Sequence, residues 1–175
     1  MGILGKFIHR NDTTDVLELL EMQHKEVDLL IEKLEKGEGN RRDVFRQLAN
    51  NLAAHATVEE KLFYPAVMAK QTSELLHESV EEHLSIKRVL ADMIEMRLDD
   101  ETFLAKLSVL KEHVSHHAHE EEEGKLFPEV KKLFDADERA GLGNDLLAMF
   151  EELMKSQPLD NVPNEIDAAA PLPAL

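Results

Sequence analysis

Histidine and glutamate recur four residues apart in two separate stretches of the chain, and a proline closes each stretch. The pairs are His55 with Glu59 and His117 with Glu121. On a helix, residues four apart lie one turn above each other on the same face, so each pair can offer an imidazole nitrogen and a carboxylate oxygen to one metal ion. Two such pairs on facing helices would enclose two ions. The repeat therefore predicts a metal site inside a helical bundle.

Two further histidines fall on the apolar faces of predicted helices. His24 lies seven residues after Leu17, and His83 lies seven residues after Leu76. Seven residues are close to two helical turns, so each histidine shares a helix face with core residues. His55 and His117, the histidines of the two pairs, likewise lie seven residues after a leucine. One histidine on such a face is usually a hydrogen-bonded core residue. Four of them, two with a glutamate, would be costly to desolvate unless a bound metal offsets that cost.

The candidate metal ligands offer nitrogen and oxygen only, because the chain contains no cysteine. This excludes thiolate metal sites, iron–sulfur clusters and thiol catalysis. Imidazole and carboxylate together suit iron, manganese, zinc or copper, and the sequence does not choose among these metals. The six candidates are His24, His55, Glu59, His83, His117 and Glu121.

The composition limits the class of protein and its partners. A chain of 175 residues with 43% apolar content can bury one core, which suggests one soluble domain with tails. A net charge of −16 repels phosphate backbones and anionic lipids, so we expect no nucleic-acid binding and no membrane binding. The apolar opening stretch is too short for a secretory core or a membrane span, and the lack of cysteine fits a reducing compartment, so we expect a cytoplasmic protein.

Four long helical patterns would carry the four histidines. Apolar residues recur at helical spacing from about residue 13 to the glycines at 37 and 39, from 43 to about 65, from 75 to 94, and from 103 to about 134. Thr13 and Thr14 are candidate caps of the first helix. Strand signals are absent throughout. The predicted fold is therefore all-α, an up-down four-helix bundle over residues 13–135.

The segments outside the bundle are predicted from composition. Residues 1–12 form an N-terminal extension, and residues 136–156 contain a short C-terminal helix with its amphipathic part at 142–154, preceded by a turn at Gly141–Gly143. Residues 157–175 hold four prolines among Asp, Asn and Ala. Such a composition buries too little apolar surface to offset the entropy of ordering, so we expect a disordered, proline-rich tail.

The order of these residues resembles the haemerythrin-like family, also called the HHE cation-binding domain. Its pattern is one His, then His-x-x-x-Glu, one His, then His-x-x-x-Glu or Asp, across four helices. The resemblance spans about residues 13–133 and includes the contexts Gln23-His24 and Glu82-His83. It implies that the four histidines are terminal ligands and that Glu59 and Glu121 bridge a non-haem di-iron centre. Two Fe ions, with Mn or Zn as other possibilities, would also share an oxo or hydroxo bridge.

One departure from the repeat concerns its second copy. The first copy has ten residues from its histidine to Pro65, whereas the second has eleven to Pro128. The extra residue makes Glu122 a rival to Glu121 as the bridging carboxylate. A locally widened helical turn could equally absorb the insertion. We retain Glu121 as the predicted ligand.

A second departure concerns the third helix. Oxygen-carrying members place two histidines four residues apart there, but Ser79 and Lys87 flank His83 in this chain. His113 could supply the missing fifth histidine, or could be a hydrogen-bond donor to a ligand or a core residue. Tyr64, the only tyrosine, either packs at a helix end or donates a hydrogen bond near the site.

The resemblance implies a function in binding or sensing O2, NO or peroxide at the di-iron centre, because six protein ligands leave coordination positions open. The sequence has no cysteine nucleophile, Gly-x-Ser-x-Gly elbow or glycine-rich phosphate loop, so any enzyme activity is at most peroxide- or NO-reactive. Two other functions compete with this one. The protein could buffer or donate iron during stress, or the bundle could bind a protein partner through its acidic surface or tail.

Overall fold

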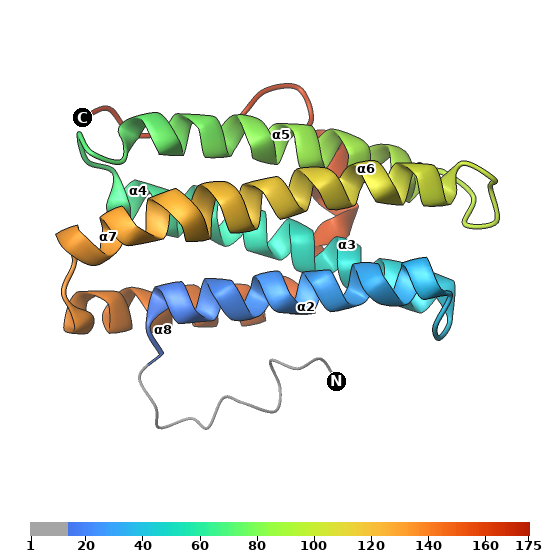
Figure 1. Cartoon of the computed structure of the whole chain (residues 1–175), viewed down its shortest axis with the longest axis horizontal. Helices are drawn as coiled ribbons and strands as arrows, with labels where there is room; N and C mark the ends of the chain where they lie inside the picture. The colour runs from blue at the N-terminus through green and yellow to red at the C-terminus, as the bar shows by residue number, and fades with distance from the viewer. Residues whose placement is uncertain (1–13) are drawn as a thin grey trace.

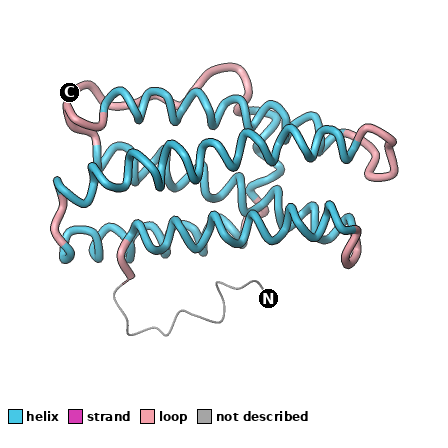
Figure 2. The backbone as a smooth tube through the Cα atoms, viewed as in Figure 1, coloured by secondary structure: helices cyan, strands magenta, loops and turns pink. Residues whose placement is uncertain are grey.

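The structure is a computed structural model that describes residues 14–175. All regular elements in this part of the chain are helical, as Figure 2 shows. Four long helical rods pack side by side as a bundle, and a further helix lies along one of them (Figure 1). The predicted all-α bundle is confirmed. The N-terminal extension predicted at residues 1–12 lies outside the described residues.

Two of the rods are single α-helices, and the other two change pitch along their length. The single helices are α2 (Val16–Lys36) and α5 (Ser73–Glu95). The second rod consists of α3 (Arg41–Val58), the π-helix η1 (Glu59–Phe63) and α4 (Tyr64–Val67). The fourth rod consists of α6 (Phe103–Ser115), the π-helix η2 (His116–Leu126) and α7 (Phe127–Leu133). Each π-helix therefore lies in one of the two repeated stretches.

The ends of α2 follow from local side-chain chemistry. The Asp15 carboxylate accepts a hydrogen bond from the Leu17 amide at 2.9 Å, so Asp15 caps the helix. The caps predicted from sequence were Thr13, which lies outside the described residues, and Thr14, which the structure places before the cap. The helix ends at Gly37, as predicted, where a φ of +68° favours glycine.

Proline does not end either of the two composite rods. Pro65 and Pro128 each lie in the first turn of the short α-helix that follows a π-helix. In a π-helix the N–H of residue i pairs with the carbonyl of residue i−5, so the turn that precedes each proline is wider than an α-helical turn. The chain can therefore pass through the repeated stretches without leaving the bundle.

Helix α8 (Ala136–Lys155) lies alongside α2, outside the four rods (Figure 1). Its bounds agree with the C-terminal helix predicted at residues 136–156 and extend beyond the amphipathic part predicted at 142–154, while the predicted turn at Gly141–Gly143 lies inside the helix. Gly143 serves there for a close approach between α8 and the backbone that precedes α2. A Cβ on Gly143 would lie 1.9 Å from the carbonyl oxygen of Thr14, so glycine is needed for α8 to reach the start of α2.

The segment 157–175, which we predicted to be disordered, packs on the bundle instead. It begins with the 3-10 helix η3 (Pro158–Asn164), and then runs back along α5 (Figure 1). Leu159 and Val162 of η3 are buried in the apolar core. Composition alone failed here because the few apolar side chains are spaced to fill one seam of the bundle.

The apolar core consists of two clusters with a polar layer between them. Along each of the four rods, the histidine lies between residues of one cluster and residues of the other. In α2, for example, His24 lies between Leu20 and Val27, which belong to different clusters. The fold therefore brings the four histidines to one level in the middle of the bundle.

Candidate metal centre

Five of the six predicted ligands meet in this polar layer. The side chains of His24, His55, Glu59, His83 and His117 are all buried, with at most 7% of any of them exposed. Their ligand atoms form two groups within which all atoms lie within 4.8 Å of one another. One group contains His24, His55, Glu59 and Glu122, and the other contains Glu59, His83 and His117. Glu59 belongs to both groups, as a bridging carboxylate would.

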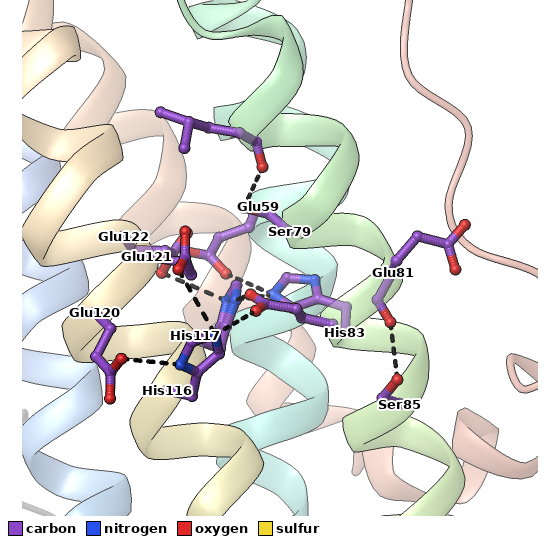
Figure 3. A network of polar contacts seen from close by, with 12 residues as sticks. Glu59, Ser79, Glu81, His83, Ser85, His116, His117, Glu120, Glu121 and Glu122 are labelled. Carbon is purple, nitrogen blue, oxygen red and sulfur yellow. Dashed lines mark hydrogen bonds and ion pairs between the residues drawn. The ribbon is translucent and has the colours of Figure 1, made fainter.

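The second repeated stretch supplies Glu122 to the cluster, and not the predicted Glu121. Glu122 is fully buried, and its Oε2 lies 3.1 Å from His24 Nε2 and 3.6 Å from His117 Nε2. Glu121 instead pairs with Lys125, and Figure 3 shows it beside His116, where the two side chains approach to 3.6 Å. The placement expected for Glu121 was therefore wrong.

The π-helix accounts for this change of carboxylate. A π-helix closes its hydrogen bonds over five residues, one more than an α-helix, so η2 sets Glu122 over His117. The same assignment follows from counting backwards, since Glu59 lies six residues before its proline and Glu122 six before its own. The proline was the better reference in the sequence, because the insertion lies between the histidine and the glutamate.

Each of the four histidines is held by a side-chain oxygen at its Nδ1. These contacts join His24 to Glu123 at 2.7 Å, His55 to Gln23 at 2.7 Å, His83 to Glu60 at 3.0 Å, and His117 to Glu82 at 2.8 Å. Carboxylate and amide oxygens accept hydrogen bonds, so each Nδ1 carries a proton and donates it. The Nε2 atoms are then directed at the cluster, which is the arrangement found for metal-binding histidines.

The sequence analysis missed these four acceptors as functional residues. Gln23 and Glu82 precede ligand histidines, and Glu60 and Glu123 follow the two cluster glutamates. Adjacent positions on a helix point about 100° apart, so a neighbour in sequence can reach the outer nitrogen of a histidine on another rod. This cross-rod contact is set by packing, and no spacing rule along one rod reveals it.

Some contacts on the inner faces of these side chains are not satisfied by hydrogen bonds. The Nε2 atoms of His83 and His117 lie 2.9 Å apart, although both carry lone pairs when Nδ1 is protonated. The buried atoms His55 Nε2 and Glu59 Oε1 have no hydrogen-bond partner. Buried polar atoms without partners are rare and destabilising. A cation at this point would satisfy all of them at once.

Tyr64 also reaches the cluster, at the end of η1. Its hydroxyl donates a hydrogen bond to Glu122 Oε1 at 2.8 Å and lies 3.4 Å from Glu59 Oε2 and 3.2 Å from His83 Nε2. Of the two roles left open for Tyr64, the structure therefore gives it the hydrogen-bonding one. It also adds an oxygen atom to the possible donors.

Comparison with protein families decides the class. The profile of the hemerythrin HHE cation-binding domain matches residues 15–130, about two thirds of the chain. The chain belongs to the hemerythrin HHE cation-binding domain family. The matched range contains the first three rods, most of the fourth, and every residue of the cluster. The family thus agrees with the resemblance drawn from the histidine and glutamate pattern.

A solved structure supports the fold of this HHE domain. The crystal structure of a hemerythrin HHE cation-binding domain-containing protein from Mycobacterium kansasii superposes with a TM-score of 0.73. The identity is 22%, and the match covers 90% of this chain and 97% of that one. No curated protein matches the chain. Within residues 14–175, no helix is long and apolar enough to cross a membrane.

The electrostatics of the HHE cluster favour a bound cation. Burial, reinforced by the charge of Glu122, raises the pKa of Glu59 well above its usual value. Burial and neighbouring histidines lower the pKa of His55 and of His83, which keeps both imidazoles neutral. Neutral imidazoles and crowded carboxylates are what a divalent or trivalent metal ion requires of its ligands.

His24 differs from the other histidines of the HHE domain. Burial acts to lower its pKa, but the hydrogen bonds and charges of Glu122 and Glu123 together raise it to about 9. Burial likewise acts to raise the pKa of Glu122, while His117 and His24 lower it below the usual range. The carboxylate Glu122 therefore stays ionised and attracts positive charge to its position.

The proposed fifth histidine lies outside the cluster. His113 is exposed and lines a surface groove with Glu82 and His116. It therefore offers no nitrogen to the group of buried ligand atoms. The HHE domain in this chain brings together four histidines, two carboxylates and one tyrosine hydroxyl, and these buried clusters fit a metal site.

Proposed function

We propose that this protein binds two iron ions in the polar layer of the bundle and uses them to bind or sense O2, NO or peroxide. His24 and His55 would hold one ion, and His83 and His117 the other. Glu59 and Glu122 would bridge the two ions. The observation that carries the proposal is that four histidines, each held at Nδ1 by a side-chain oxygen, direct their Nε2 atoms at two buried carboxylates.

Iron in such a nitrogen and oxygen site would supply redox chemistry and open positions for a small ligand. The residues around it set which ligand can enter. A cavity of about 20 Å³ adjoins the four histidines, and its other lining is apolar except for Lys87. A single water needs roughly 10–15 Å³, so this space suits a molecule of two to four atoms. Its size supports O2, NO or peroxide as ligand and disfavours larger substrates.

The protein side chains would keep the protons of the site in fixed places. Each Nδ1–H stays on its histidine because a side-chain oxygen accepts it. Burial and the charge of Glu122 raise the pKa of Tyr64 well above its usual value, so its hydroxyl keeps a proton to donate. Apart from the four histidines and Lys87, the side chains that line the cavity are apolar. These features favour controlled binding of one small ligand.

The test is to purify the protein from iron-replete cells and to measure metal content and the visible spectrum. We expect two irons per chain and charge-transfer bands that change with O2, NO or peroxide. The double variant Glu59→Ala/Glu122→Ala, prepared in parallel, should lack both. A folded wild-type protein that carries only zinc, or no metal under iron-replete conditions, would overturn the proposal.

The same preparation tests the iron-buffering alternative. Because every ligand is buried, we expect iron to leave slowly to a chelator such as ferrozine in the presence of reductant. Slow loss, over hours, supports a resident cofactor. Complete transfer within seconds would instead favour iron storage or donation.

A further inference from the structure

One of the carboxylates that anchor the histidines is itself held by a buried cation. Lys87 Nζ lies 2.9 and 2.8 Å from the two carboxylate oxygens of Glu60, which accepts the Nδ1–H of His83. Lys87 is only 6% exposed. The corresponding carboxylates Glu82 and Glu123 have no lysine or arginine partner in the described part of the chain. His83 is therefore set apart from the other histidines.

The same ammonium group also binds the C-terminal segment. Glu165 Oε2 lies 2.8 Å from Lys87 Nζ, directly after η3. The segment is fixed there by the buried Leu159 and Val162 and by a hydrogen bond of 3.0 Å from Arg88 to the carbonyl of Ile166. A continuous chain of contacts thus leads from Glu165 through Lys87 and Glu60 to His83.

We propose that Glu165, Lys87 and Glu60 are positioning residues through which the C-terminal segment tunes the metal-binding strength of His83. The inference rests on the proposed function, since it concerns the same centre. Docking or release of the segment would then regulate the redox balance of the ion held by His83. Residue Glu165 lies beyond the matched family range of 15–130, so this control is not part of the bundle itself.

The direction of the effect follows from the hydrogen bonds. A free carboxylate accepts strongly from Nδ1–H and makes the opposite nitrogen a stronger donor to metal. Lys87 withdraws charge from Glu60 and weakens this effect. Glu165 competes for the same ammonium and partly restores it. Removal of Lys87 and removal of Glu165 should therefore act in opposite directions, which a purely structural role would not produce.

The first measurement is the reduction potential of the iron-loaded protein. Lys87→Met should shift the one-electron equilibrium of the iron toward the oxidised form by about tenfold, which corresponds to ~59 mV. Glu165→Gln should shift it toward the reduced form by a smaller factor. Matched controls are Lys106→Met and Glu152→Gln, which remove exposed partners of surface pairs away from the centre. The controls should leave the equilibrium unchanged.

The second measurement uses metal-free protein and separates this inference from the proposed function. The proton NMR shift of His83 Nδ1–H should move downfield in Lys87→Met and upfield in Glu165→Gln. If iron fails to bind, the proposed function is wrong. The NMR shifts still test whether Glu165 and Lys87 act on His83 through Glu60. If iron binds but Lys87→Met and Glu165→Gln shift the measured values in the same direction, or match their controls, the proposed control of His83 through Lys87 and Glu60 is wrong. Should Lys87→Met not fold, the sign of the Glu165→Gln shifts decides, because that variant keeps the Lys87–Glu60 pair.

Discussion

The two repeated stretches deliver equivalent side chains from different lengths of chain. Counted back from proline, Glu59 and Glu122 occupy the same position, and both enter the cluster. The residues that follow them are also equivalent in role. Glu60 accepts the Nδ1–H of His83, and Glu123 accepts that of a histidine on α2. The extra residue of the second stretch changes none of this.

The difference between the stretches lies in helical pitch and in polarity. η1 spans 5 residues and η2 spans 11, so the wider turn of the second stretch extends over the insertion. The residue before proline is Tyr64 in the first stretch and Phe127 in the second. The comparison shows that the two cluster glutamates share one distance from proline, whereas the two histidines differ in theirs by one residue. The electrostatics around each glutamate are set separately.

The largest expected effect comes from removing both equivalent carboxylates. Glu59→Ala/Glu122→Ala should lose both ions, because Glu59 and Glu122 are the two carboxylates that lie with the four histidines in the buried groups of ligand atoms. Each single variant should retain one ion or fewer per chain. Metal analysis by mass spectrometry after gel filtration measures the result, with circular dichroism to show that the helices remain.

Glu121→Ala is the matched control for the double variant. Its carboxylate is buried, but it lies outside the cluster and pairs with the exposed Lys125, so two ions per chain should remain. Loss of metal from Glu121→Ala together with retention in Glu122→Ala would reverse the assignment.

A smaller effect is expected at the glutamates that anchor histidines. Glu60→Gln should weaken iron binding by about 10- to 100-fold, the usual range for partners of metal ligands. It also leaves Lys87 with one carboxylate fewer in a buried position. Glu123→Gln should cost less than about tenfold, because Glu123 is 28% exposed and water can take over its contact. Competition with a chelator of known affinity measures both, and equal losses would contradict the asymmetry.

Much of the fold was readable from the sequence, because apolar periodicity is strong on all four rods. The same periodicity nominated His24, His55, His83 and His117, whose faces are set by local helix geometry. Pitch was not readable in the same way. Periodicity assumes a constant number of residues per helical turn. The π-helix has more residues per turn, and it lies where the sequence had to choose between Glu121 and Glu122.

The C-terminal segment shows a second limit of the sequence. Its composition predicts disorder, but Leu159 and Val162 fit a seam that exists only after the bundle has formed. Likewise, the Lys87–Glu165 pair joins residues far apart in sequence. Such contacts depend on tertiary packing, which local propensity does not encode.

Tyr64→Phe makes the first stretch resemble the second, and its effect should be smaller again. The variant removes the donor to Glu122 Oε1, which should lower the free energy of unfolding by about 1–2 kcal/mol. Two ions should remain, with iron affinity reduced by about tenfold at most, as for other outer partners. Denaturant unfolding and chelator competition measure the two effects. Phe63→Leu, which copies Leu126 of the second stretch without removing a polar atom, should lower stability but leave affinity unchanged.

The smallest effect is expected from making the two stretches equal in length. Deleting one residue from the run Glu120–Glu123 places the proline ten positions after His117, as Pro65 is after His55, and any choice within the run gives the same sequence. A glutamate then lies four residues after His117, as Glu59 does after His55. If the π-helix only accommodates the extra residue, the helices before and after the deletion should keep their packing in the bundle. The shortened chain should then still bind two ions. We expect the free energy of unfolding to change by no more than about 1–2 kcal/mol.

The matched control for this deletion is removal of Lys61 from the first stretch. Lys61 is exposed, so its side chain contributes little to the core. Its removal places the proline nine positions after His55 instead of ten. Glu59 should then be displaced from the cluster and iron binding lost. Metal content and thermal melting of the two deletions give the comparison directly. Loss of iron from the Glu120–Glu123 deletion, with helices intact, would mean that the wide turn of η2 shapes the site and does more than accommodate an extra residue.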